Sequence, residues 1–225
     1  MPDSAASSRI QLWDWPVRLS HWGFAALVPA LWLSAEAGRM DLHKQLGLVM
    51  LALVVFRLGW GLVGSTPARF ASFLSGPRRV LAYLRGGTWS GIGHNPLGGW
   101  SVAALLAMLS AQLSLGLICE DSDGLESGPL NHYVSYDTAA LARAGHELGF
   151  DLLAVLVGVH LAAIAWYRFR RREDLVTPML TGRRRFAHHV AQPQMAPAWR
   201  AVVLAALAGA LAWWVGQGAP LGAAA

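Results

Sequence analysis

The stretch GHELGFDLLAVLVGVH, from Gly145 to His160, places two histidines around one of the most apolar segments of the chain. In an α-helix, fourteen residues advance about 21 Å along the axis. They also bring the side-chain direction back to within about 40° of its start. The two imidazoles are therefore predicted to lie on one face of one helix at two depths. A polar or ionisable side chain inside a bilayer is costly and needs a partner, so the rest of the chain must supply two.

The composition is that of a membrane protein. Of 225 residues, 55% are hydrophobic and only 14% are charged, which is too apolar for a typical soluble domain. The single cysteine, Cys119, excludes an internal disulfide framework. The net charge is +5, but the arginines cluster between apolar runs, so membrane topology explains them and no nucleic-acid partner is expected. The polar start lacks the pattern of a signal peptide, so the first apolar run is expected to remain as a membrane helix.

Five apolar runs are candidates for membrane spans, and each of the first four is near the ~20 residues that cross ~30 Å of hydrocarbon. They cover about residues 19–34, 43–63, 99–119, 146–167 and 201–215. The fifth is shorter and rich in Ala and Gly, which leaves a span, a re-entrant segment or a surface helix open; we favour a span. We predict an all-α membrane protein with a four-helix transmembrane bundle in residues 1–185. A linker and a fifth, C-terminal transmembrane helix would follow in residues 186–225.

The distribution of Arg and Lys in the short loops predicts the orientation. The N-terminal segment and the connections after the second and fourth runs are rich in arginine, whereas the connection over residues 120–145 is acidic. On the side of that acidic connection, the basic residues are only Arg39, Lys44 and Arg143. We therefore expect a cytoplasmic N-terminus and an acidic surface in the opposite compartment.

Depth in the predicted helices pairs four of the eight histidines. His43 can meet His146 near the far face, and His21 can meet His160 near the cytoplasmic face. Two imidazoles from facing helices suit the axial positions of a haem iron. Interfacial histidines at helix ends are an alternative for three of the four, but His160 lies inside its span. A zinc site is disfavoured because zinc needs three or four close ligands, and the two pairs lie ~20 Å apart.

Two further residues are candidates for the site. Arg57 follows His43 by fourteen residues, and an intramembrane arginine needs an anion such as a haem propionate; the alternative is a side chain that extends to the cytoplasmic interface. His94, in GHNPLGGW, precedes the third run and is a candidate for quinone binding or proton uptake, because a histidine can donate, accept and titrate near neutral pH. Its alternative role is a hydrogen bond that holds the Asn95–Pro96 turn.

Several stretches carry a resemblance to a known family. They are WDWPVRLSHW (Trp13 to Trp22), LHKQLGLVMLALVVFRLGWGLVG (Leu42 to Gly64), ARFASFL (Ala68 to Leu74), GHNPLGGWSV (Gly93 to Val102), GHELGFDLLAVLVGVHLAAIAW (Gly145 to Trp166) and LVTPMLTGRRR (Leu175 to Arg185). Together they resemble the bacterial cytochrome b561 family, which includes the cytochrome b subunit of nickel–iron hydrogenases. The resemblance covers roughly residues 11–185, and the C-terminal apolar segment lies outside it.

The resemblance implies a multi-pass protein of the bacterial inner membrane with two haems b. One haem would be ligated by His21 and His160 and the other by His43 and His146. It also implies electron exchange between the quinone pool and a periplasmic partner, either a c-type cytochrome or a hydrogenase-like subunit. Two alternatives stay open. One is a free-standing superoxide:ubiquinone oxidoreductase, which the acidic far side disfavours except at Lys44. The other is a haem-free membrane anchor subunit.

Overall fold

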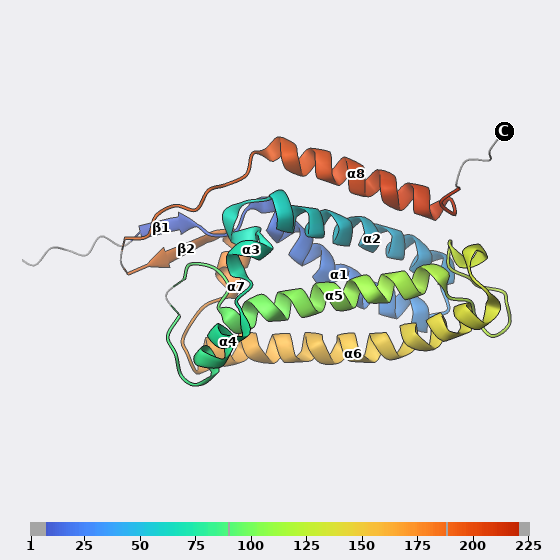
Figure 1. The fold of residues 1–225 in the computed structure, drawn as a ribbon, viewed down its shortest axis with the longest axis horizontal. Helices are drawn as coiled ribbons and strands as arrows, with labels where there is room; N and C mark the ends of the chain where they lie inside the picture. Colours follow the sequence, from blue (N-terminus) through green and yellow to red (C-terminus); the bar gives the residue numbers. More distant parts are fainter. Residues whose placement is uncertain (1–7, 90, 188, 221–225) are drawn as a thin grey trace, which may run out of the picture.

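The computed structural model describes residues 8–89, 91–187 and 189–220, and most of them are helical. The elements are β1 (Ser8–Gln11), α1 (Trp15–Glu36), α2 (Met40–Val63), the 3-10 turn η1 (Thr66–Ala68), α3 (Phe70–Phe73), α4 (Pro77–Leu84), α5 (Pro96–Ile118), the 3-10 turn η2 (Asn131–Tyr133), α6 (Tyr136–Phe169), α7 (Val176–Thr181), β2 (Arg183–Phe186) and α8 (Ala198–Gly216). The helices α1, α2, α5 and α6 run up and down in a bundle, and α8 lies along α2 (Figure 1).

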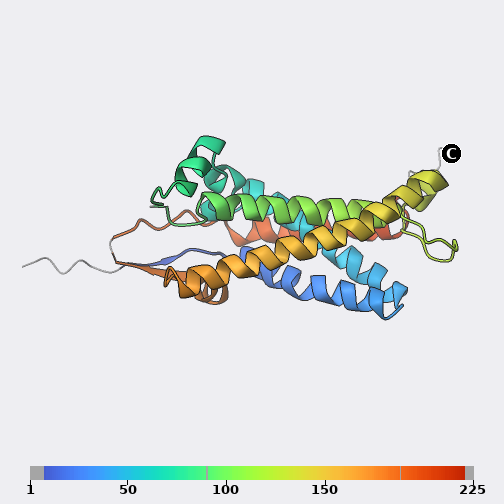
Figure 2. The ribbon, with the colours of Figure 1, turned by 90° about the horizontal axis from the view of Figure 1, so that it is seen from below.

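Four described helices, α2, α5, α6 and α8, are long and apolar enough to cross a membrane. Helix α1 has 22 residues, but its tryptophans, serines, prolines and histidine lower its mean hydropathy, and it is not among the four. It nevertheless packs along α2 in the bundle, and Figure 2 shows it extending through the same thickness as its neighbours. The prediction of an all-α bundle with a further C-terminal helix is confirmed.

Helix α1 begins earlier than hydropathy predicts because its first turn is held by a buried carboxylate. Asp14 is the N-cap residue, and its Oδ1 atom accepts a hydrogen bond from the Val17 amide at 3.0 Å. Its Oδ2 atom accepts a second bond from Trp60 Nε1, also at 3.0 Å. Asp14 thereby joins the start of α1 to the last turns of α2 and holds these two helix ends together.

Helix α6 is longer than the predicted span. It has 34 residues, or about 51 Å of helix, and begins at Tyr136 rather than near His146. Ser135 caps it by accepting a hydrogen bond from the Thr138 amide. Hydropathy detects only the part of a helix that lies in hydrocarbon, so the polar first turns of α6 were assigned to the acidic connection.

The centre of the bundle is an apolar layer between the two histidine levels. Met50 and Val54 of α2 pack with Leu109 of α5 and Leu153 of α6, and all four side chains are buried. Side chains of α1 pack against this cluster. The backbones of α1 and α6 do not pack closely along their length, in contrast to the pairs α1–α2 and α5–α6. The two helices that carry His21 and His160 are thus held together mainly through α2 and α5.

Helix α8 packs on α2 through small side chains. Ala201, Ala208, Ala212 and Val215 are buried and share one face, as is common for closely packed membrane helices. At its start, Arg200 donates a hydrogen bond to the Val63 carbonyl at the end of α2. After its last turn, Ala219 accepts one from Tyr133 in the opposite connection. Within the described chain α8 therefore runs from one end of the bundle to the other, as expected of a span.

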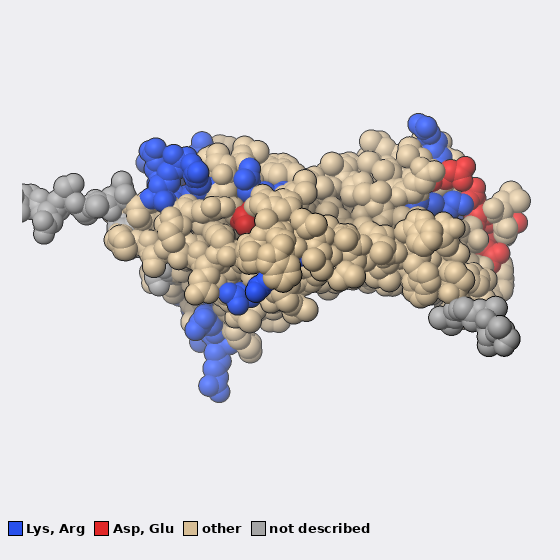
Figure 3. Space-filling view, turned by 90° about the horizontal axis from the view of Figure 1, so that it is seen from above, with Lys and Arg blue, Asp and Glu red and all other residues tan. Residues whose placement is uncertain are grey.

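A small sheet, which hydropathy does not predict, joins the segment before α1 to the segment after α6. Strands β1 and β2 pair antiparallel, with Ser8 opposite Phe186 and Gln11 opposite Arg183. Gly182 turns the chain with a φ of +78°, and its carbonyl accepts hydrogen bonds from the Leu12 and Trp13 amides. The basic segment after α7 is thereby held next to the start of α1. Figure 3 shows most basic side chains gathered at this end and most acidic side chains at the other, where a few basic ones lie among them, with a largely uncharged belt between the two ends.

Candidate functional site: two histidine pairs

The histidine pair at the acidic end is formed by His43 of α2 and His146 of α6. Their ring centroids lie 6.3 Å apart, and the ring planes are nearly perpendicular, at 84°. Nδ1 of His43 is hydrogen-bonded to the Leu31 carbonyl, and Nδ1 of His146 to the Gln112 carbonyl, each at 2.9 Å. A carbonyl acceptor requires the proton on Nδ1, which leaves the Nε2 lone pair of each ring for a metal.

This spacing suits two imidazoles bound to one metal ion from opposite sides. A metal–nitrogen bond of about 2 Å, plus about 1 Å from nitrogen to ring centre, gives centroids about 6 Å apart. Among the described residues, no group of three His, Cys, Asp or Glu side chains is placed to hold a metal ion. A tetrahedral zinc site therefore does not fit, whereas a haem needs only two axial ligands from the protein.

Glycines let α5 and α6 approach closely around His146. A Cβ atom at Gly116 would lie 2.9 Å from Cε1 of the His146 ring, and one at Gly149 would lie 2.3 Å from Oε1 of Gln112. Gln112 also donates from Nε2 to the His146 carbonyl at 2.8 Å. Gln112 thus binds His146 twice, through its own carbonyl to the ring and through its side chain to the backbone. The sequence indicated neither Gln112 nor Gly116.

Gly116→Ala is expected to disturb this pair selectively. The new methyl group would press on an imidazole that cannot rotate without losing its hydrogen bond to Gln112, and overpacking of this kind costs about 1–3 kcal/mol. We expect partial loss of the haem at this pair and full retention at the other, measured as haem per chain and by the optical spectrum. Gly209→Ala is the control, because a Cβ atom there meets nothing within 4 Å. Equal haem content in the two variants would contradict the prediction.

The pair at the basic end is formed by His21 of α1 and His160 of α6. The two side chains are close enough to interact electrostatically. Nδ1 of His21 is buried and has no hydrogen-bond partner, and the edge of the ring faces Trp22 at a centroid distance of 5.0 Å. His94 interacts electrostatically with both histidines and with Arg57. The structure thus gathers all the predicted cytoplasmic-side residues from four parts of the chain.

His94 does not hold the turn before α5. That turn is held by Asn95, whose Oδ1 atom accepts from the Gly98 amide at 2.7 Å while Nδ2 donates to the Tyr167 hydroxyl at 2.7 Å. The Tyr167 hydroxyl also bonds that of Tyr83 at 2.9 Å, and burial together with this bond raises the pKa of Tyr83 to about 12. Nδ1 of His94 is buried, and no described residue is its hydrogen-bond partner, so the observed hydrogen bonds of this turn come from Asn95 and not from Nδ1 of His94.

Arg57 is inside the protein rather than at the interface. Its side chain is only 5% exposed, its guanidinium lies 5.7 Å from the centre of the Phe70 ring, and Nη1 has no hydrogen-bond partner. This burial favours an internal partner for Arg57 over a side chain that reaches to the interface. Asp14, which sequence reasoning overlooked, interacts with Arg57 electrostatically, although its two oxygens accept from Val17 and Trp60.

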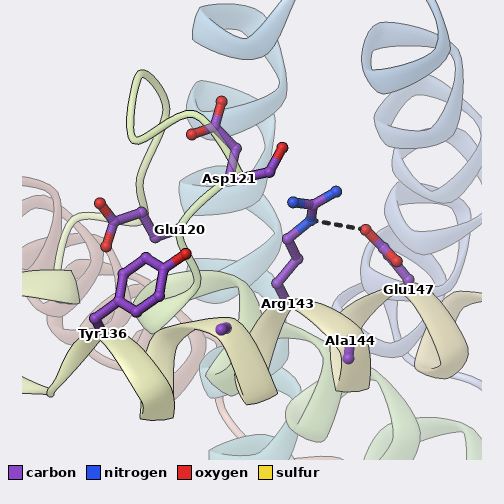
Figure 4. A pocket seen from close by; sticks show the side chains of 8 residues that line it. Glu120, Asp121, Tyr136, Arg143, Ala144 and Glu147 are labelled. Atoms are coloured by element: carbon purple, nitrogen blue, oxygen red, sulfur yellow. Dashed lines mark hydrogen bonds and ion pairs between the residues drawn. The ribbon is translucent and has the colours of Figure 1, made fainter.

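The surface at this end of the bundle, next to His146, is acidic. Figure 4 shows a pocket lined by Glu120, Asp121, Tyr136, Arg143 and Glu147, with Arg143 Nε bound to Glu147 Oε1 at 2.9 Å. The connection after α5 folds back in a short bridge between Glu120 and Ser127. Glu126 of this connection binds Lys44 at 2.6 Å, so the one basic residue next to His43 is paired with an acid.

The chain matches the family model of prokaryotic cytochrome b561 over residues 12–182. The matched range includes α1, α2, α5 and α6 with both histidine pairs, and it ends before α8. No curated protein and no solved structure matches the chain. The match covers well over half of the sequence, and the helical bundle agrees with it. The chain therefore belongs to the prokaryotic cytochrome b561 family, and it is a multi-pass bacterial membrane protein that binds haem b and transfers electrons.

Proposed function

We propose that the chain holds two haems b and carries electrons across the membrane between a periplasmic redox partner and the quinone pool. His43 and His146 would ligate one haem, and His21 and His160 the other. The observation that carries the proposal is the geometry of His43 and His146, whose rings are 6.3 Å apart with both Nδ1 atoms bound to carbonyl groups. Haem supplies a one-electron carrier at each level when it is bound.

The protein residues tune and insulate these sites. Hydrogen bonds from Nδ1 to carbonyl groups fix the orientation of each far-side imidazole and raise its basicity as a ligand. The apolar layer of Met50, Val54, Leu109 and Leu153 separates the two levels and excludes water. Since His146 and His160 are about 21 Å apart along α6, and the macrocycle edges would be closer, two carriers span most of the hydrocarbon.

The proposed orientation has the N-terminus in the cytoplasm and the acidic end in the periplasm. The basic end carries the N-terminal segment, α4 and the segment after α6, and cytoplasmic loops of membrane proteins are rich in Arg and Lys (Figure 3). Residues 1–185 would form the haem-binding unit, and residues 186–225 would add α8 and place the C-terminus in the periplasm. The fifth helix accounts for the opposite locations of the two termini.

The periplasmic partner is proposed to be a c-type cytochrome or a hydrogenase-like subunit with a basic docking face. Acidic side chains at the end of the bundle that carries His43 and His146, among them Glu120, Asp121 and Glu147, would attract such a partner by long-range electrostatics. The same charges disfavour the alternative of a superoxide:ubiquinone oxidoreductase, because superoxide is an anion. Lys44, the basic residue next to His43, is paired with Glu126 and does not offset this repulsion.

Quinone is proposed to react at the haem of His21 and His160, on the cytoplasmic side. His94 lies beside this site with a buried, unpartnered Nδ1 atom. With a proton on this nitrogen, His94 can donate a hydrogen bond to a quinone carbonyl or to a carboxylate of the haem itself. Replacement of His94 would raise the KM for quinone in the first case and change the haem potential in the second.

The first test is a pyridine haemochrome assay on the detergent-purified chain, combined with protein quantification. The expected result is two haems b per chain. A colourless protein, made with haem in ample supply, would reject the proposal in favour of a membrane anchor. One haem per chain would reject the two-haem architecture. Quinone reduction by the isolated chain with superoxide as the only donor would favour the free-standing enzyme over the partner-linked carrier.

A further inference from the structure

We propose that Arg57 and His94 together form a carboxylate-binding site that holds a propionate of the haem ligated by His21 and His160. The inference rests on the two-haem function proposed above and adds a role for His94. The site would bind the haem at its periphery, separately from the two axial ligands. It would also set the reduction potential of this haem relative to the other.

Arg57 presents a charged donor that the rest of the protein leaves unsatisfied. The side chain is 5% exposed, and its Nη1 atom has no hydrogen-bond partner. The acid that acts on Arg57 is Asp14, but among the described residues no ion pair or hydrogen bond joins the two, and the oxygens of Asp14 are directed to Val17 and Trp60. A buried guanidinium that lacks an anion is strongly unfavourable. This arrangement therefore indicates a second carboxylate that comes from outside the polypeptide.

His94 presents a second unsatisfied donor in the same place. Its ring lies between Trp13 and Phe73, with centroid distances of 4.7 and 4.8 Å. Its Nδ1 atom is buried and has no partner, although buried polar atoms nearly always have one. With the proton on Nδ1, the ring would donate one hydrogen bond to an acceptor in this enclosure.

The two donors lie in one region beside the histidine pair: Phe70, next to Arg57, contacts Phe73, which contacts the His94 ring. His94 interacts electrostatically with Arg57, His160 and His21. The aromatic side chains of Trp13, Phe70 and Phe73 surround the two donors and limit access of water. An acceptor that satisfies both donors must be anionic to neutralise Arg57. A haem propionate meets this requirement, whereas the carbonyl of a neutral quinone does not.

The arrangement predicts a shift in the reduction potential of one haem. The positive charge of Arg57 opposes the extra positive charge of ferric haem, so its removal should stabilise the oxidised form. Arg57→Gln is expected to lower the Fe(II)/Fe(III) equilibrium constant of the cytoplasmic-side haem about tenfold, which is about 59 mV for a one-electron couple. His94→Phe should produce a smaller shift in the same direction.

The experiment is an optical redox titration of the detergent-purified holoprotein, together with resonance Raman spectra of the haem propionate bending band. The haem under study is identified as the one that disappears in His160→Ala. Arg57→Lys keeps the charge and should leave the potential nearly unchanged. If Arg57→Gln fails to fold, the smaller shift in His94→Phe carries the test. Arg85→Gln is the matched control, because Arg85 is an exposed arginine on the same side. The shifts in Arg57→Gln and His94→Phe should not add in the double variant.

The inference and the proposed function fail in different ways. Wild-type protein without two haems would overturn the proposed function. Two haems in every variant, with an unchanged potential and an unchanged propionate band in Arg57→Gln, would overturn the carboxylate site alone. The carboxylate site would also be overturned if Arg57→Gln shifted the potentials of both haems equally and by no more than the exposed control Arg85→Gln does. If His94→Phe raised the KM for quinone but left the band and the potential unchanged, His94 would be a quinone ligand instead.

Discussion

Replacement of His160 by alanine is expected to halve the haem content, from two haems b per chain to one. His160 lies inside the apolar part of α6, toward its cytoplasmic end, and it is the only one of the four proposed ligands that an interfacial position does not explain. Without its imidazole, the haem would keep only His21, whose Nδ1 atom has no carbonyl group to orient the ring. Alanine is the best helix former, so α6 itself should persist.

The measurement is haem per chain by pyridine haemochrome, with electron paramagnetic resonance to detect a high-spin haem that has lost one axial ligand. His21→Ala should give the same spectrum as His160→Ala, because the two residues share one iron. His189→Ala is the matched control, since His189 is exposed in the basic segment after β2. Two low-spin haems in His160→Ala would show that His160 is not a ligand, and the assignment at the cytoplasmic end would be withdrawn.

The pairing of histidines was predictable because helical geometry converts spacing into depth. His146 and His160 are fourteen residues apart, and the positions of His21 and His43 at the ends of their apolar runs determine which partner each can reach. The structure brings the predicted residues together at both levels. The spacing of the histidines does not predict which atom orients each imidazole ring. The Leu31 and Gln112 carbonyls act through the backbone, and any residue type supplies a carbonyl group.

The environment of Arg57 was predictable only in part for a related reason. The second apolar run contains no acid, which suggested that the anion must be the haem. The structure adds Asp14, which comes from the first turn of α1 and is far away in the sequence. Its role is apparent only once α1 packs on α2, because Trp60 of α2 then donates to it. Contacts of this kind depend on tertiary packing, and hydropathy carries no information about them.

The ends of the helices and the sheet were missed because hydropathy identifies hydrocarbon-immersed residues only. The first turns of α6 are polar and the pairing of β1 with β2 is formed largely by basic and polar residues. By contrast, α8 could be predicted as a span from its length and apolar composition, and the structure adds the face that it uses. Its alanine seam places its backbone close to α2, so α8 lines the outside of the bundle away from both histidine pairs.

Replacement of His43 or of His146 by alanine is expected to remove the other haem, and each substitution should remove the same one. The rings lie 6.3 Å apart, the distance at which both can bind one iron, so neither ligand suffices when the other is absent. The protein should retain one haem b per chain in His43→Ala, in His146→Ala and in the variant with both changes. A further loss in the double variant would mean that the two residues serve different haems.

The complementary combination supplies the sharper result. His43→Ala combined with His160→Ala removes one ligand from each proposed pair, so this protein should contain no haem, whereas His43→Ala combined with His146→Ala should keep one. Both double variants remove two histidines, and all three substituted positions are only partly buried in the helices that carry them, so a general loss of stability would affect the two proteins alike. A difference in haem content therefore reports the pairing itself. If both proteins kept one haem, the assignment of His43 with His146 would be wrong, because pairs that share an iron must fail together.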